Sequence, residues 1–173
     1  MARASIRPTR ADEGEVLREI ERRAGERFHE VGLHDVADAE PMSVESLAAY
    51  ARAGRSWVAV DAHDVPAGYV IVDVVDGNAH IEQISVQPNH QGTGLGRALI
   101  AHVRDWASER GMSDTTLSAF VAIPWNRPLY EHLGFVVIED HQIGPELRVV
   151  RQRETLHGLD PTQRVCMRLD LHG

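Results

Sequence analysis

Residues 91 to 100 read Gln91-Gly92-Thr93-Gly94-Leu95-Gly96-Arg97-Ala98-Leu99-Ile100, with glycines at alternate positions. An apolar run, Ile81 to Val86, precedes this segment, and a helical pattern follows it directly. Glycines allow the backbone to wrap closely around a ligand. A helix that begins at such a turn adds free N–H donors and the positive end of its dipole, and these together bind phosphate. The segment therefore predicts a phosphorylated cofactor at the end of a strand.

The spacing of the glycines differs from two common phosphate-binding motifs. A P-loop ends in Gly-Lys-Ser/Thr, whereas Gly96 is followed by Arg97 and Ala98. A dinucleotide-binding fingerprint places G-x-G-x-x-G directly after a strand, whereas here the spacing is G-x-G-x-G, and residues 87–91 separate it from the strand. On the glycines alone, an ordinary glycine-rich turn remains the alternative.

Two motifs together resemble the GNAT family of N-acetyltransferases. The pattern Q-x-x-G-x-G after Ile84-Ser85-Val86 resembles the acetyl-CoA loop of that family. A later segment, Asn126-Arg127-Pro128-Leu129-Tyr130-Glu131-His132-Leu133-Gly134-Phe135, is similar to its Asn…Tyr…Gly-Phe motif. The resemblance covers residues 56–140, with a weaker match at both ends. It implies a fold and a reaction class, and it is nearly silent on the substrate.

The resemblance also implies a cofactor site. The backbone N–H groups of residues 92–97 would bind the pyrophosphate of acetyl-CoA, and the backbone of residues 84–86 would pair with its pantetheine arm. An N–H near Ile84 would stabilise the oxyanion that forms from the thioester. The expected cofactor-binding residues are Ile84, Ser85, Val86, Gln91, Gly92, Thr93, Gly94, Leu95, Gly96, Arg97, Asn126 and Tyr130.

Two of these residues carry further roles by the same resemblance. Tyr130 would protonate the departing thiolate, and Asn126 would hold the cofactor arm. The two residues are one helical turn apart, so they face the same side of a helix. Without the glycine segment, Asn126 reads as a helix cap and Tyr130 as a core aromatic residue.

A catalytic base is expected because a primary amine, with a pKa of about 10.4, is almost entirely protonated at neutral pH. Glu82 lies two positions before Ile84 on the same predicted strand, so simple alternation places both on one face. Carboxylates seldom occupy apolar strands unless they are exposed, paired or functional. His80 is a second candidate for the base. It also stays open that Glu82 is only a carboxylate on a solvated face and that the protein supplies no base.

Composition limits the classes of function. The 173 residues fit one domain, residues 1–173, with a substantial core. The net charge of −8 argues against a nucleic-acid partner and favours a cationic amine. No apolar run has the length of a membrane span, and the first residues lack a signal-peptide core. Cys166 is the single cysteine, which fits a reducing cytoplasm. Ten histidines occur without HExxH or a Cys/His cluster, so no metal is expected.

The pattern of apolar residues predicts an α/β fold with a mixed, mostly antiparallel sheet, a central parallel crossover and flanking helices. A helix capped by Thr9 runs through Ile20, and residues 28–42 form a loop or a short broken helix. The other expected elements are a helix from Ser43 to Gly54, strands 57–60, 68–75 and 80–86 as an antiparallel meander, a helix from Leu95 to Gly111 with Leu95, Leu99, Val103 and Trp106 on one face, a parallel strand 115–121, a short helix ending at His132, a strand 135–138, a helix 146–157 and a strand 164–171.

These observations predict an acetyl-CoA-dependent N-acetyltransferase that acts on a primary amine, preferably of a small molecule. The amine would attack directly in a ternary complex, since Cys166 lies in the last predicted strand, away from the motifs. The alternatives are a protein lysine or N-terminal acetyltransferase and, outside this class, a non-catalytic acyl-CoA-binding module; a nucleotide-binding protein ranks below both. Substrate contacts are expected from residues 28–40, with Asp35, Asp38 and Glu40, and from Trp125; the sequence does not name the amine. A homodimer is compatible with all of this.

Overall fold

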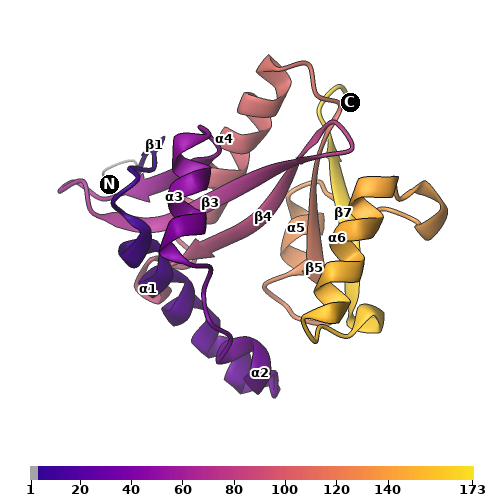
Figure 1. The fold of residues 1–173 in the computed structure, drawn as a ribbon, viewed down its shortest axis with the longest axis horizontal. Helices are drawn as coiled ribbons and strands as arrows, with labels where there is room; N and C mark the ends of the chain where they lie inside the picture. The colour runs from indigo at the N-terminus through magenta and orange to yellow at the C-terminus, as the bar shows by residue number, and fades with distance from the viewer. Residues whose placement is uncertain (1–3) are drawn as a thin grey trace. The chain divides into compact units, whose positions relative to one another are not determined.

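The computed structural model describes residues 4–173, and within them the strands form a seven-stranded sheet in the order β1-β2-β3-β4-β5-β7-β6 (Figure 1). The parallel pair is β4 with β5, whereas β1 with β2, β2 with β3, β5 with β7 and β6 with β7 are antiparallel. This confirms the predicted mixed, mostly antiparallel sheet with a parallel crossover. The strands are β1 (Ser5–Pro8), β2 (Ser56–Val60), β3 (Pro66–Val75), β4 (Asn78–Val86), β5 (Asp114–Phe120), β6 (Val136–Val137) and β7 (Arg164–Asp170).

The helices lie between these strands in chain order, and α4 makes the crossover from β4 to β5. No helix within residues 4–173 is long and apolar enough to cross a membrane. The α-helices are α1 (Gly14–Gly25), α2 (His34–Ala37), α3 (Val44–Arg52), α4 (Leu95–Glu109), α5 (Arg127–His132) and α6 (Pro145–Leu156); the 3₁₀ helices are η1 (Glu26–Val31), η2 (Pro88–His90), η3 (Asp140–Gln142) and η4 (Pro161–Gln163).

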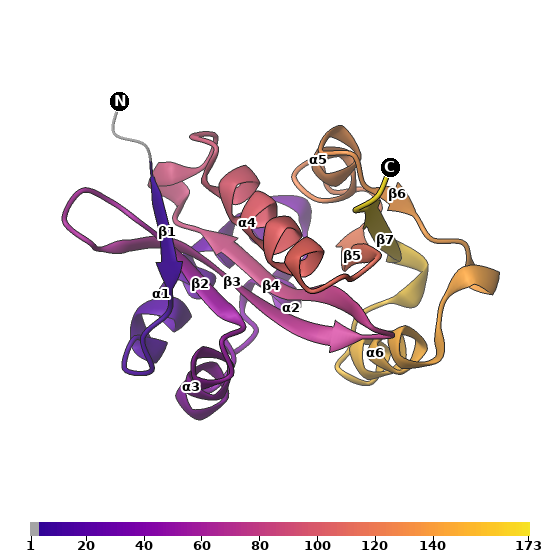
Figure 2. The ribbon, with the colours of Figure 1, turned by 90° about the horizontal axis from the view of Figure 1, so that it is seen from above.

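The chain divides into two compact units, Met1–Val72 with Gln83–His102 and Asp73–Glu82 with Val103–Gly173. In the first unit, α1 and α3 pack on one face of β2 and β3, and the first half of α4 lies on the other face (Figure 2). The ring of Trp57 lies 5.1 Å from that of His102 on the α4 side. The core on the α1 side consists of Leu17, Ile20, Leu47, Val58, Val60, Tyr69 and Ile71.

The second unit has its own core, in which α6 packs against β7 and the β3–β4 hairpin. Its buried members are Val75, Ile138, Ile143, Leu147, Val150 and Cys166. The hairpin turn also caps α6, because the Asp76 carboxylate accepts the backbone N–H groups of Glu146 and Leu147, each at 3.0 Å. Glu146 in turn accepts the N–H of Asp76 at 2.6 Å. Two segments 70 positions apart are thereby joined.

The first residues differ from the prediction. Ser5–Pro8 forms the edge strand β1, so α1 begins at Gly14, and Thr9 does not cap it. Thr9 is buried, and its hydroxyl accepts a hydrogen bond from the Ser56 hydroxyl at 2.7 Å. The prediction was wrong because β1 pairs with β2, some fifty positions along the chain, and a local pattern does not reveal such a pairing.

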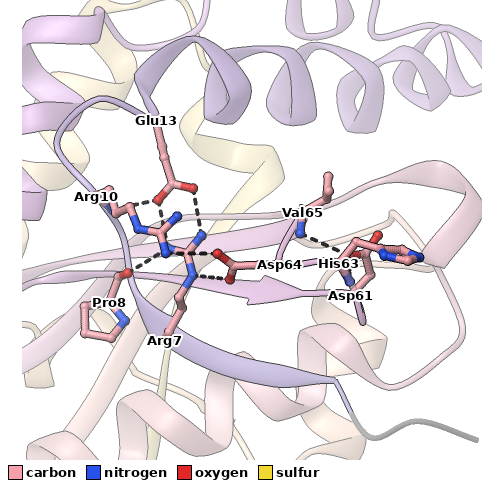
Figure 3. Close-up of polar contacts among 8 residues, drawn as sticks. All are labelled: Arg7, Pro8, Arg10, Glu13, Asp61, His63, Asp64 and Val65. Carbon is pink, nitrogen blue, oxygen red and sulfur yellow. Dashed lines mark hydrogen bonds and ion pairs between the residues drawn. The ribbon is translucent and has the colours of Figure 1, made fainter.

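An ion-pair cluster holds β1 in place (Figure 3). The Arg7 guanidinium binds Glu13 through two hydrogen bonds of 2.9 Å and Asp64 through one of 2.7 Å. Arg10 adds a bond of 2.9 Å to Asp64 and donates its backbone N–H to Glu13. The hydrogen bond from Arg7, its largest cause, lowers the pKa of Glu13. The cluster joins β1, the start of α1 and the β2–β3 turn.

The remaining elements follow the prediction with small shifts. Residues 28–42 contain most of η1 and all of α2, which together are a broken helix. The Ser43 hydroxyl caps α3 by accepting the N–H of Ser46. The strand expected over 135–138 is only Val136–Val137. On α4, Ala107 is buried, and Trp106 lies partly exposed beneath the Arg110 guanidinium.

Candidate active site

The glycine segment forms an open turn at the start of α4. Gly92 and Gly94 have φ values of +77° and +88°, and a Cβ on either would meet no atom within 4 Å beyond its chain neighbours. Ala98 donates to the carbonyl of Gly94 at 3.0 Å, which closes the first turn of α4. The N–H groups of residues 95–97, which precede Ala98 in α4, have no acceptor within the helix. The turn therefore presents donors and a positive helix end to open space, as a phosphate-binding turn requires.

The side chains of Gln91 and Thr93 maintain the shape of this turn. Gln91 donates through Nε2 to the carbonyl of Val86 at 3.3 Å and accepts through Oε1 from the Arg27 guanidinium at 2.8 Å. The Thr93 hydroxyl donates to the carbonyl of His90. Both residues were predicted to bind the cofactor, and that role stays a prediction; in the structure their side chains bond within the protein and support the conformation of the turn.

Residues 84–86, which were predicted to pair with the cofactor, lie on a buried polar network that the sequence analysis missed. Ser85 is buried and accepts a hydrogen bond from the Gln83 amide at 2.9 Å. The Tyr69 hydroxyl bonds both to Ser85 and to the Glu21 carboxylate, the latter at 3.1 Å. Burial raises the pKa of Glu21, and burial followed by the Glu21 charge raises that of Tyr69. One residue in the sequence could have indicated this network. Glu21 lies four positions after the core residue Leu17, so it lies on the same face of α1 as Leu17.

Glu82 lies in the second unit with an environment suited to a base. Glu82 is exposed to solvent as a whole residue, yet crowding around its carboxyl group raises its pKa to about 7. The nearby Asp73 carboxylate is the next contribution to the rise, and Arg153 opposes it. Glu82 can therefore exchange a proton near neutral pH.

His80 is placed differently. Its side chain is 2% exposed, and its Nδ1 lies 2.9 Å from the Thr116 hydroxyl. Burial lowers its pKa to about 4, so the imidazole is neutral at physiological pH. Of the two candidate bases, only Glu82 combines contact with solvent and a pKa near 7.

Asn126 directly precedes α5 and Tyr130 lies within it, also in the second unit. The Asn126 amide oxygen accepts the N–H of Phe120 at 3.1 Å, so it ties the start of α5 to the end of β5 and does not cap the helix. Tyr130 is partly exposed, and its ring meets that of Phe135 edge to face, with centroids 5.9 Å apart. This contact orients the tyrosine ring, and Gly134 at φ +99° makes the turn that brings Phe135 back.

A cavity of 530 Å³ opens in the first unit, beside α1. Its size is that of a small-molecule site. It involves the segment predicted to contact substrate, although Asp35 does not line it. Asp38 accepts a hydrogen bond from His29 Nε2 at 2.8 Å, and His29 Nδ1 lies 2.7 Å from His34 Nδ1. The lining residues are Arg22, Glu26, His29, Ala37, Asp38, Ala39 and Glu40.

Comparison with known proteins gives a family model, described as the acetyltransferase (GNAT) family, that matches residues 15–135. The streptothricin acetyltransferase of Streptomyces lavendulae is 44% identical over 59 residues, which are 33% of this chain and 31% of that protein. The ribosomal protein bS18-alanine N-acetyltransferase of Escherichia coli K12 is 38% identical over 69 residues, 40% of this chain and 47% of that protein. Both alignments span less than two thirds of the relative's own length.

Solved structures share the fold. That of the Escherichia coli ribosomal-protein-S18-alanine N-acetyltransferase has a TM-score of 0.68 at 22% identity, covering 98% of this chain and 94% of the other. The N-acetylglutamate synthase of Neisseria gonorrhoeae, solved with coenzyme A and N-acetyl-glutamate, has a TM-score of 0.73 at 19% identity, covering 100% of this chain and 36% of that one.

Proposed function

This chain belongs to the acetyltransferase (GNAT) family, and we propose that it is an acetyl-CoA-dependent N-acetyltransferase acting on the primary amine of a small molecule. The observation that carries the proposal is the open glycine turn at the start of α4, since its exposed backbone donors fit the pyrophosphate of coenzyme A. Within the proposal, residues 92–97 bind the phosphates, and the backbone of residues 84–86 receives the pantetheine arm.

Glu82 and Tyr130 handle the two protons of the reaction. Glu82 takes a proton from the ammonium group, directly or through water, and the neutral nitrogen then bonds to the acetyl carbonyl carbon. The bond from that carbon to sulfur breaks, and Tyr130 donates its hydroxyl proton to the departing thiolate. The nitrogen loses its second proton through water, which restores the Tyr130 hydroxyl, and Glu82 returns the first proton to solvent. The pKa of about 7 supports Glu82 as the base, because a base acts best when its pKa lies near the working pH.

Direct transfer is favoured over a route through cysteine. Cys166 is buried at 1% exposure, and burial raises the pKa of its thiol. A thiol is nucleophilic only as the thiolate, so this residue is suited to packing and not to carrying an acetyl group.

The cavity beside α1 supports a cationic small-molecule acceptor. Glu26, Asp38 and Glu40 line it together with one guanidinium, that of Arg22. Arg22 is bonded to Glu19 at 2.9 Å and Glu40 to Arg18 at 3.1 Å, so carboxylates outnumber guanidinium groups among the lining residues. The similarity to the streptothricin acetyltransferase points in the same direction.

The second candidate is acetylation of a protein amine. It is favoured by the similarity to the bS18-alanine N-acetyltransferase and to a peptidyl-lysine N-acetyltransferase of Escherichia coli K12, which is 31% identical over 107 residues. We further propose that residues 1–173 act as one domain. We also propose a location in the cytoplasm, because a single cysteine fits a reducing compartment. A homodimer also remains a prediction.

The test is a panel of diamines, amino acids, cationic antibiotics and peptides, assayed with acetyl-CoA by release of free thiol. All 18 basic residues of the chain are arginine, so it cannot acetylate itself on a lysine, and any acetyl-lysine must come from the added substrate. A small amine is expected to react faster than every peptide. Faster reaction of a peptide would favour the second candidate, and binding of coenzyme A without transfer to any amine would favour a non-catalytic module.

A further inference from the structure

One side chain joins the cavity wall to the glycine turn. Arg27 lies in η1, and its Nη1 donates to the Gln91 amide oxygen at 2.8 Å in a partly buried contact. The two residues are 64 positions apart in the chain, so the bond is a tertiary link. Both ends lie within the first compact unit.

The turn end of this link is anchored at a second point. The nitrogen of the Gln91 amide donates to the carbonyl of Val86, the last residue of β4. Gln91 thus spans the end of β4 and the first glycine of the turn, and Arg27 orients it. A charged donor makes a stronger hydrogen bond than a neutral one, so the orientation of Gln91 depends on Arg27.

The other end of the link is the cavity. Glu26 precedes Arg27, and His29 follows it by two positions; both line the cavity from the same short 3₁₀ helix. His29 also bonds to Asp38, another lining residue, so η1 and α2 are held together. A shift of η1 on binding of an acceptor would therefore be transmitted to Gln91 and the glycine turn.

We propose that Arg27 is a positioning residue that couples the cavity to the acetyl-CoA turn, so that coenzyme A binding orders η1 and α2. This inference rests on the proposed function. Coupling between two sites is reciprocal, so ordering of η1 by coenzyme A equally means that an occupied cavity favours the cofactor-bound turn. The enzyme would then assemble its acceptor site when the acetyl donor is in place.

The experiment compares the whole chain with Arg27→Met, which keeps most of the aliphatic stem and removes the donor. The matched control is Arg23→Met, since Arg23 is exposed on α1 and its guanidinium bonds to Glu19 at 2.7 Å. Calorimetry with coenzyme A should show affinity at least about 5-fold weaker for Arg27→Met, the low end of usual coupling, and unchanged for Arg23→Met. Arg27→Lys, which restores one donor, should recover part of the loss.

Hydrogen exchange supplies a readout that simple loss of stability would not produce. In wild type and Arg23→Met, coenzyme A should slow exchange both at residues 91–97 and at residues 26–38. In Arg27→Met the slowing should remain at 91–97 and disappear at 26–38. Gln91→Leu should act like Arg27→Met, and the double variant should be no weaker than Gln91→Leu alone, because the two side chains share one interaction.

The outcomes separate the two proposals. A wild-type chain that does not bind coenzyme A would contradict the proposed function itself. Binding by wild type with the same affinity and the same exchange pattern in Arg27→Met would overturn the coupling and leave the proposed function intact. If Arg27→Met does not fold, Gln91→Leu and Arg27→Lys decide by the same two measurements.

Discussion

The Glu82 carboxyl group resists ionisation, because burial and the Asp73 carboxylate together raise its pKa to about 7. If Glu82 is the base, as proposed, it must be ionised to act, so kcat/KM of the wild type should rise with pH through about 7. Glu82→Gln should lower kcat/KM at neutral pH by about 10²- to 10⁴-fold, the usual contribution of acid–base catalysis. Raising the pH should partly rescue the variant, because more of the amine arrives neutral. Parallel profiles of equal rate would make Glu82 a surface carboxylate.

Asp73→Asn provides the matched control for that profile. It removes one cause of the raised pKa and leaves the Glu82 carboxyl group in place. The acid limb of the wild-type curve should therefore move to lower pH. An unshifted limb would mean that the titrating group is not Glu82.

The same residue makes a prediction for stability. The ordinary pKa of 4.5 applies in the unfolded chain, and the folded value is about 7, so between these values the folded protein binds more protons. The contribution of Glu82 is thus most favourable below about pH 4.5 and is lost as pH rises through about 7. Glu82→Gln should melt at a higher temperature than wild type at pH 8 and gain much less at pH 4. Equal gains at both pH values would argue against the raised pKa.

The role of the Tyr130 hydroxyl can be tested by removing its single oxygen atom. Tyr130→Phe keeps the ring that packs on Phe135 and removes the hydroxyl. If that hydroxyl protonates the thiolate, kcat should fall by about 10²- to 10⁴-fold while coenzyme A affinity changes little. Direct calorimetry and steady-state kinetics separate the two effects. Full kcat in the variant would return Tyr130 to the role of a packing residue.

At the scale of the elements, local patterns gave the right result where the causes are local. The glycine turn with α4, the Ser43 cap and the turn at Gly134 all depend on neighbouring residues, and the structure has all of them. Partners distant in the chain were missed. Strand β1 needs β2, the start of α6 needs Asp76, and the surroundings of Ser85 need Tyr69 and Glu21. The pKa of Glu82 likewise depends on Asp73, which lies on another strand.

The start of α4 gives a prediction in which stability and binding move apart. A Cβ on Gly96 would have its nearest contact at 3.9 Å, so Gly96→Asp fits sterically. An aspartate in the first turn stabilises a helix by about 0.3–1 kcal/mol, yet its charge repels phosphate. The variant should melt at or above the wild-type temperature and bind coenzyme A far more weakly. Ser46→Asp, in the first turn of α3, adds the same charge to another helix and should leave coenzyme A affinity unchanged.

At the scale of the whole molecule, the negative charge of the chain should assist the approach of the proposed cationic acceptor. The 26 acidic and 18 basic residues leave a net charge of −8, and the carboxylates of the cavity add a local negative field. Such a field attracts cations over a distance that salt shortens to about 8 Å at physiological ionic strength. The cationic charge of the acceptor should therefore influence how fast it is captured more than how fast it reacts.

The prediction is a salt dependence that grows with the charge of the acceptor. Between low salt and about 0.5 M NaCl, kcat/KM for a triamine should fall more steeply than for a monoamine, because screening removes more attraction from the larger charge. The value of kcat should change little, since the bound acceptor is already in place. Glu26→Gln should flatten the triamine slope, whereas Glu109→Gln, at the exposed end of α4, is the control that removes the same charge elsewhere. Equal slopes for both acceptors would show that the acidic balance of the chain plays no part in selecting its substrate.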